Sequence, residues 1–457
     1  MPPPTKHVLL FFGAVLFLSA WHLFGGTNDN ATSRAAMVAS IVEHGTFNID
    51  AYADHAGDVA SINGHTYSVK APLPALLVVP FWWALRPLLH CEAVKEGELD
   101  PNLIRLGGFL MGSLPFALIT TLIWASMYRM NSKGHLSIAW AAVLPLFGSF
   151  LFIQSGAFFG HLISALFLLL ACRAWERDRH LVCGALAGCA VLCEYTAAVF
   201  PLCWGIVALF RRDLSSLRGL LIGILPVLGL LAAYNASISG SPFNLGYSHQ
   251  VGYDYMHYAA GFGSPRLVPL WHITFSDYRG LFFYAPALMA ALVALFAQGQ
   301  APRWWVDPIV LPSIITIVLM SGFGGWWGGW SYGPRYLTAP VVLLFYRSLP
   351  SVVCWKWTRW AFAPLCLFGL LCAFAAKDTV GFSVPTEARH PLVQVILPAL
   401  NGSGSDSQWP VLLGVPATLS SVLFLGSFIA ALFVLRRLDG AIRSSTAGGM
   451  TGSGRAS

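Results

Sequence analysis

The sequence predicts an all-α polytopic membrane protein with about 12 transmembrane helices and a long first extracytoplasmic loop that carries interfacial helices. Hydrophobic residues make up 56% of the 457 residues and charged residues only 10%, unlike the composition of a soluble domain. Apolar stretches of about 15 to 25 residues recur along the chain, which is the length of a membrane-spanning helix. Basic clusters recur in short loops two spans apart, as cytoplasmic loops do.

The basic clusters predict the topology. They lie within residues 129–133, 173–179, 211–218, 347–359 and 436–443, which places residues 27–105, 236–279, 323–335 and 377–410 outside and both termini inside. Of the 27 Lys and Arg residues 17 then lie inside, and of the 20 Asp and Glu residues 15 lie outside when Glu194 at an outer turn is included. We therefore expect an integral protein of the inner or plasma membrane. The net charge of +7 is divided among separate inner loops, so it indicates no nucleic-acid partner.

The first outer loop contains the elements that we expect to lie at the membrane surface. Residues 8–24 before it are predicted to be a retained first helix, because no small-residue cleavage site follows. Residues 32–44 place apolar side chains on one stripe, between cap oxygens at residues 28–30 and Gly45. This pattern predicts a helix on the membrane surface. Residues 71–90 contain four prolines and Arg86, and we interpret them as an interfacial helix rather than a span.

Asp29 is the carboxylate best placed for catalysis, since it lies just past the outer end of the first span. Near a low-dielectric boundary its pKa would rise and let it act as a general base. The alternative is that Asp29 only caps the following helix. Arg34 and Lys70 lie at headgroup depth, where an arginine and a lysine can hold a phosphate. For these two the alternatives are snorkelling and contact with ordinary anionic lipids.

A tryptophan-rich run at residues 324–340 carries five glycines, three tryptophans and a single cation, Arg335. An ionisable residue at membrane depth is a candidate for function, although the tryptophans also suit an aromatic belt. Asp277 and Arg279 lie at another outer span end, and an ion pair of Asp277 with Arg279 or Arg335 is the structural alternative. Glu194 at an outer turn and His161 at a span start are further candidates for binding polar substrate groups.

Several signatures of other enzyme classes are absent from the sequence. It contains no Gly-x-x-x-x-Gly-Lys phosphate loop, no dinucleotide fingerprint and no Gly-x-Ser-x-Gly elbow. Asp50, Asp54, His55 and Asp58 follow no standard metal-loop spacing, and we interpret them as a solvated acidic face. We predict neither a metal site nor a cofactor.

The order of these motifs resembles that of a known group. An acid after the first span, an Asp…Arg helix, Tyr-Ser-Val-Lys-Ala-Pro-Leu at residues 67–73 and Tyr-Gly-Pro-Arg-Tyr-Leu at residues 332–337 are similar to GT-C membrane glycosyltransferases. The nearest branch includes protein O-mannosyltransferases and lipid A aminoarabinose transferases. The resemblance covers about residues 8–350. It departs from the pattern in reading Lys-Ala-Pro and in a longer Asp-to-Arg spacing.

The resemblance implies an inverting glycosyltransferase with a polyprenyl-phosphate-linked sugar as donor. It implies that Asp29 is the base on the acceptor and that Arg34 and Lys70 hold the donor phosphate. We assign Arg279, Arg335, Asp277, Glu194, His161 and Tyr332, which opens the second motif, to substrate binding.

The predicted organisation is a catalytic transmembrane module at residues 1–350, C-terminal transmembrane helices with an outer loop at 351–443, and a disordered tail at 444–457. Membrane lipids are expected partners, and the acceptor, whether lipid, glycan or protein, stays open. The alternative function is a transporter or flippase of lipid-linked sugars. A non-catalytic scaffold would give no reason for so many cations in outer, aromatic-rich loops.

Overall fold

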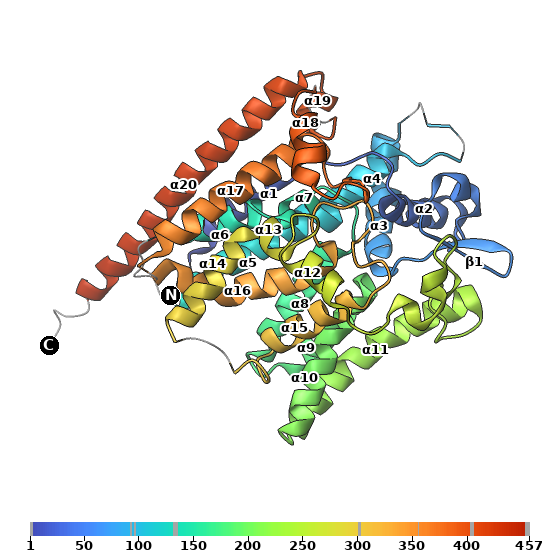
Figure 1. Cartoon of the computed structure of the whole chain (residues 1–457), viewed down its shortest axis with the longest axis horizontal. Helices are drawn as coiled ribbons and strands as arrows, with labels where there is room; N and C mark the ends of the chain where they lie inside the picture. Colours follow the sequence, from blue (N-terminus) through green and yellow to red (C-terminus); the bar gives the residue numbers. More distant parts are fainter. Residues whose placement is uncertain are drawn as a thin grey trace.

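The structure, a computed structural model, describes residues 3–91, 94–95, 97–130, 136–299, 303–354, 356–402 and 406–452. Helices dominate it, as predicted (Figure 1). Within the described residues the one sheet is a hairpin of β1 (Val59–Ile62) and β2 (His65–Ser68), which the sequence interpretation did not include.

Among the described residues, five helical stretches are long and apolar enough to cross a membrane: Pro101–Tyr128, Leu214–Ser239, Arg335–Cys354, Trp360–Asp378 and Ala417–Ile442. They include α4 (Pro101–Gly108), α5 (Leu114–Met130), α11 (Leu214–Ser239), α16 (Thr338–Cys354), α17 (Thr358–Asp378) and α20 (Ala417–Gly452). Shorter apolar helices pack among them: α1 (Thr5–Ser19), α6 (Ile138–Phe147), α8 (His161–Trp175), α9 (His180–Cys193), α10 (Val199–Phe210), α14 (Pro286–Ala297) and α15 (Val310–Ser321). These helices support an integral membrane protein, and the number of about 12 spans stays a prediction.

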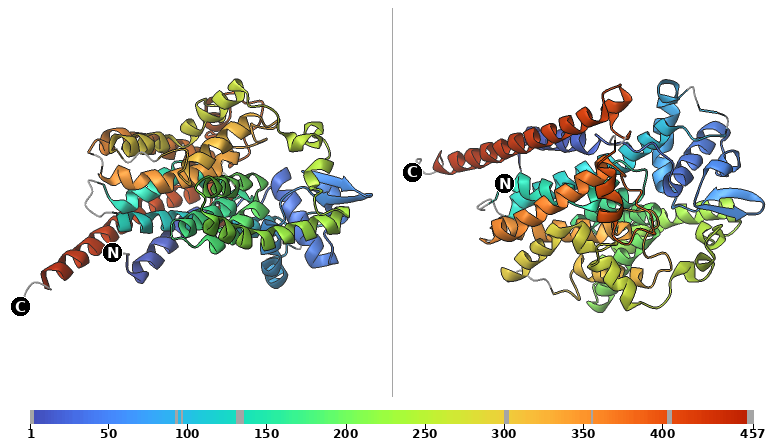
Figure 2. Two further views of the ribbon diagram at one scale, coloured as in Figure 1. Left: turned by 90° about the horizontal axis from the view of Figure 1, so that it is seen from below. Right: turned by 45° about the horizontal axis from the view of Figure 1, so that its top comes forward.

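The first-loop elements gather at one end of the molecule, away from both chain termini (Figures 1 and 2). They are α2 (Asp29–His44), the hairpin and α3 (Leu73–Leu89). The helix predicted at residues 32–44 is present as α2, and Gly45 ends it in a left-handed conformation with φ 67°. Its N-cap is Asn28, whose side chain accepts a hydrogen bond from the backbone N–H of Asn30. The capping role considered for Asp29 is therefore wrong.

The environment of α2 also differs from the prediction. Residues Asn30 to Ser40 are all buried, because α3 and the hairpin pack against the helix. A helix whose polar Ser33 and Arg34 are as buried as its apolar residues cannot lie freely on a membrane surface. The amphipathic pattern located the helix, and tertiary packing covered it.

The hairpin brings two distant charged residues together. Asn63 and Gly64 form its turn, with φ values of 53° and 84°, which suits the Asn-Gly pair. The antiparallel register pairs Val59 with Ser68. Asp58 lies one residue before this pair and Lys70 two residues after it, and the hairpin brings the side chains of these two residues together.

Two helix ends differ from the prediction. Helix α1 ends at Ser19, because the chain beyond it turns to pair His22 with Gln408. Helix α20 continues to Gly452, into the segment predicted to be a disordered tail. Continuing an existing helix requires no new nucleus, which is why Gly and Ser there do not stop it. Residues 453–457 of that predicted tail lie outside the described residues.

Candidate active site

A cavity of about 920 Å³ lies where the first-loop elements meet the bundle. Its wall comes from the start of α2, the residues that flank the hairpin, the C-terminal end of α9, the segment around residues 245–262 and the tryptophan-rich run. This size suits an organic ligand. Its charged lining residues are Asp29, Asp58, Lys70, Glu194 and Arg335.

Asp29 is the first residue of α2 and lies against Gly57, where any Cβ would overlap the Asp29 carboxyl group. The glycine thus leaves room for the Asp29 side chain. Burial raises the pKa of Asp29, and the neighbouring Asp58 raises it further, while Lys70 and Arg335 act in the opposite direction. A carboxyl group with a raised pKa is a better proton acceptor, as a general base requires.

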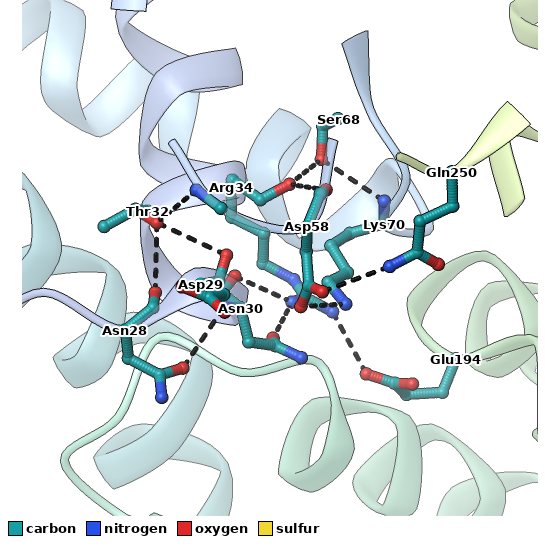
Figure 3. Close-up of polar contacts among 12 residues, drawn as sticks. Asn28, Asp29, Asn30, Thr32, Arg34, Asp58, Ser68, Lys70, Glu194 and Gln250 are labelled. Carbon is teal, nitrogen blue, oxygen red and sulfur yellow. Dashed lines mark hydrogen bonds and ion pairs between the residues drawn. The ribbon is translucent and has the colours of Figure 1, made fainter. Parts of the chain in front are cut away.

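Lys70 and Asp58 form a close ion pair, with 2.6 Å between Nζ of Lys70 and Oδ2 of Asp58 (Figure 3). Burial alone would raise the pKa of the Asp58 carboxyl group, but the Lys70 ammonium outweighs this effect, so the pKa of Asp58 lies below its usual value. The interpretation of Asp58 as part of a solvated acidic face is therefore wrong. In the folded chain, Asp58 is part of the cavity wall.

Glu194 follows the last residue of α9, and its carboxylate contacts two residues that do not line this cavity. Arg34 is 1% exposed, and its Nη2 lies 3.1 Å from Oε1 of Glu194. Its Nη1 donates to the backbone and side-chain oxygens of Asn30. Nδ1 of His161 lies 3.4 Å from the same Glu194 oxygen. Arg34 and His161 therefore position Glu194, and Arg34 itself does not line the cavity.

Arg335 reaches the cavity from the tryptophan-rich run. Its guanidinium lies 5.6 Å from the Phe159 ring centre and 5.3 Å from that of Tyr336, within the range of cation–π attraction. The side chain is 8% exposed, and its Nε has no hydrogen-bond partner among the described residues. A buried guanidinium with an unused donor is suited to an anionic ligand.

Among the described residues, two charged side chains of the cavity wall have no ion-pair partner. Asp58 pairs with Lys70, and Glu194 pairs with Arg34. Asp29 and Arg335 form no ion pair with any other described residue. Arg335 is buried, and burying an uncompensated charge is unfavourable, so this cation marks the cavity as a candidate for function, while the more exposed Asp29 lies in the same lining.

Besides Arg34 and His161, three further predicted substrate-binding residues do not line the cavity. Arg279 is fully buried and donates to the backbone carbonyl oxygens of Tyr278, Trp327, Gly329, Val384 and Pro385. Asp277 pairs with His390 at 2.7 Å on the surface, so the alternative pairing with Arg279 or Arg335 is also wrong. Tyr332 packs its ring against Tyr284 at 4.6 Å. Arg279 was expected to lie beside Arg335 at the substrate site. It does not, because it donates to the backbone of the tryptophan-rich run.

Sequence reasoning missed Asp58 and the aromatic wall formed by the segment around residues 245–262. That wall includes Tyr247, Tyr253 and Tyr255. The Asn63-Gly64 pair was the signal that would have identified the hairpin and hence the Asp58–Lys70 contact. The tyrosines follow no periodic pattern, and only the folded loop brings them to the site. In the part of the chain that the structure describes, no group of three or more His, Cys, Asp or Glu residues is arranged to hold a metal ion.

No protein-family profile matches the sequence. No curated protein matches it either. Among solved structures, the chain is similar to ArnT from Cupriavidus metallidurans bound to undecaprenyl phosphate, with a TM-score of 0.46 and 14% identity over 96% of this chain and 72% of that chain. For ArnT in the apo state the TM-score is 0.49 and the identity 15%, over 96% of this chain and 74% of that chain. ArnT is a lipid A aminoarabinose transferase, a member of the group that the sequence resembles.

Proposed function

We propose that the protein is an inverting glycosyltransferase that moves a sugar from a polyprenyl-phosphate donor to an acceptor on the extracytoplasmic side of the membrane. The observation that carries this proposal is that Asp29 and Arg335, two opposite charges without ion-pair partners among the described residues, line one cavity together with Lys70. One carboxylate and two cations are the groups that displacement of a lipid phosphate from a sugar requires.

In the proposed reaction the acceptor hydroxyl oxygen attacks the anomeric carbon from the side opposite the phosphate. A new carbon–oxygen bond forms as the bond from the anomeric carbon to the phosphate oxygen breaks, and the configuration inverts. The leaving group departs as a polyprenyl phosphate that carries the bonding electron pair. Asp29 accepts the hydroxyl proton, while Arg335 and Lys70 stabilise the charge that develops on the phosphate.

The remaining lining supports a donor that is part lipid and part sugar. Phe262, Met320 and Phe323 supply apolar surface of the kind that a polyprenyl chain contacts. Tyr253 and Tyr255 supply amphipathic rings on the same wall. The acceptor is not assigned, since lipid, glycan and protein hydroxyls would all serve the same step.

The test is replacement of Asp29 by Asn, which keeps the shape of the side chain and removes its basicity. We expect release of polyprenyl phosphate from a labelled donor to fall by about 10²-fold or more. Binding of undecaprenyl phosphate to the purified variant should stay close to that of the unmodified protein. Asp54→Asn is the matched control, because Asp54 is exposed in the same loop and does not line the cavity. Full activity of Asp29→Asn would overturn the assignment.

A transport measurement beside the release assay distinguishes the alternative function. A flippase would move a labelled lipid-linked sugar across reconstituted vesicles without releasing polyprenyl phosphate. That result, together with an unaffected Asp29→Asn variant, would replace the glycosyltransferase proposal by transport.

A further inference from the structure

The Asp58–Lys70 ion pair is almost completely enclosed. The side chains are 11% and 7% exposed, and both line the cavity. A lysine ammonium carries one unit of charge, and a carboxylate at 2.6 Å compensates most of it. An anionic ligand that approaches Lys70 therefore meets a cation that already has an anionic partner.

Asp58 is itself fixed in place by several contacts. Its backbone adopts φ 49°, a left-handed conformation that Asp and Asn tolerate better than most residues. Its carbonyl oxygen accepts a hydrogen bond of 2.9 Å from the Ser33 hydroxyl, and Oδ1 accepts one of 3.2 Å from the Gln250 amide (Figure 3). Both carboxylate oxygens are thus held, one by Gln250 and one by Lys70.

The phosphate of a donor and the Asp58 carboxylate compete for Lys70, because two anions in a buried site repel each other. Their chemistry toward an ammonium is nevertheless alike, since both present charged oxygen acceptors. The group that a phosphate must replace at Lys70 is therefore Asp58.

We propose that Asp58 is a positioning residue that holds Lys70 at the cavity wall and gives up this ion pair to the phosphate of the donor. The inference rests on the proposed function and adds a specificity device to it. Ligands that carry a phosphate gain Lys70 as a partner and offset the loss of the Asp58 pair. Neutral lipids have nothing to exchange and leave the pair closed.

The first test is a double-mutant cycle on binding of undecaprenyl phosphate to the purified full-length protein at one pH and one ionic strength. Asp58→Asn leaves Lys70 without its competitor, so the Kd should fall by about threefold to tenfold. Lys70→Met should raise the Kd. In the double variant the tightening should vanish, because Asp58 acts through Lys70. Asp54→Asn serves as the control for loss of a negative charge in the same loop.

Asparagine suits the left-handed backbone at position 58, and Asp58→Gly is a second neutral variant that suits it equally. If one variant does not fold, the other carries the cycle. Equal tightening in the Lys70→Met background would mean that Asp58 acts by general repulsion, and it would overturn the inference. Unchanged or weaker binding in both neutral variants would also overturn it.

A second readout distinguishes this role from a merely structural one. Asp58, Lys70 and Arg335 are the charged groups that act on Asp29, and Asp58 is the one that raises the Asp29 pKa. Asp58→Asn should therefore move the acid limb of kcat/KM to lower pH, and a limb that does not move contradicts the inference. If the unmodified protein binds undecaprenyl phosphate and Asp58→Asn changes nothing, the inference fails alone. If the unmodified protein binds no polyprenyl phosphate, the proposed function fails together with it.

Discussion

At the residue scale, the proposed chemistry depends on whether Asp29 is ionised. Burial and Asp58 raise the pKa of its carboxyl group, and a base works only when deprotonated. The rate of transfer should therefore rise with pH through a pKa above that of an ordinary aspartate and be lost below it. The donor is a phosphodiester that stays anionic over this range, so the limb reports the enzyme. A kcat/KM profile from about pH 4 to about pH 8, the range in which carboxyl groups with raised pKa values titrate, measures this limb.

A profile that is flat to the acid end would contradict a titrating base. The comparison with Asp54→Asn, whose carboxyl group is exposed, shows whether general loop charge affects the limb. That variant should retain the profile of the unmodified protein.

Arg335 is the second residue on which the proposal depends. Arg335→Gln should raise the KM for the donor by about tenfold or more, because a charge-assisted contact to phosphate is lost. Arg335→Lys should recover only part of this, since an ammonium cannot make the two-point contact of a guanidinium. Arg389→Gln is the control, because Arg389 is exposed and does not line the cavity. Equal KM values for Arg335→Gln and Arg389→Gln would remove Arg335 from the site.

At the scale of elements, the tryptophan-rich run is held in place by Arg279, a cation that does not line the cavity. Arg279 donates to the carbonyl oxygens of Trp327 and Gly329 in this run and to those of Val384 and Pro385 in the loop that follows α17. It therefore joins two loops that far-apart parts of the sequence supply. The glycines of the run let Tyr255 approach, since a Cβ on Gly324 would lie 2.5 Å from its ring.

Arg279→Gln should lower the free energy of unfolding by about 2 kcal/mol or more, because several buried carbonyl oxygens lose a charged donor. The change should appear as a lower melting temperature of the purified protein. Donor KM should also rise, since Arg335 is carried by the loosened run. Arg335→Gln offers the opposite pattern, with altered KM and a nearly unchanged melting temperature. A melting temperature of Arg279→Gln like that of Arg389→Gln would contradict this division of roles.

At the scale of the whole molecule, the first-loop elements and the two termini lie at opposite ends (Figure 1). The predicted topology places the hairpin outside and the turn between α10 and α11 inside. Asn63 is exposed in the hairpin turn, and Ser215 is exposed in the first turn of α11, next to the turn after α10. In a Cys91→Ser background, Asn63→Cys should react with an impermeant maleimide on intact cells. Ser215→Cys should react only after permeabilisation, and the reverse result would invert the topology.

Composition and local pattern were sufficient for much of this protein. Apolar stretches of spanning length predicted the helical membrane fold, and residues 28–45 predicted α2 almost to its ends. Asp29, Lys70, Glu194 and Arg335 were all selected from the sequence, and all line one cavity. They could be selected because charged residues are rare near membrane depth, so each one that occurs there carries information. Their roles in substrate binding stay a prediction.

The tertiary structure decided which charges are neutralised and which are left over, because ion pairs join residues that no local pattern relates. Arg34 looked equivalent to Lys70, yet it lies behind the wall on Glu194, which is 160 residues away along the chain. Arg279 looked equivalent to Arg335, yet backbone carbonyl oxygens surround it. By itself the sequence predicted a membrane helix bundle whose outer loops carry several cations and the candidate base Asp29. Only the packing of the hairpin and the loops around the cavity brought Asp29 and Arg335 into one cavity without an ion-pair partner among the described residues. Ion pairs form between side chains that are close in space, and these distances exist only in the folded chain.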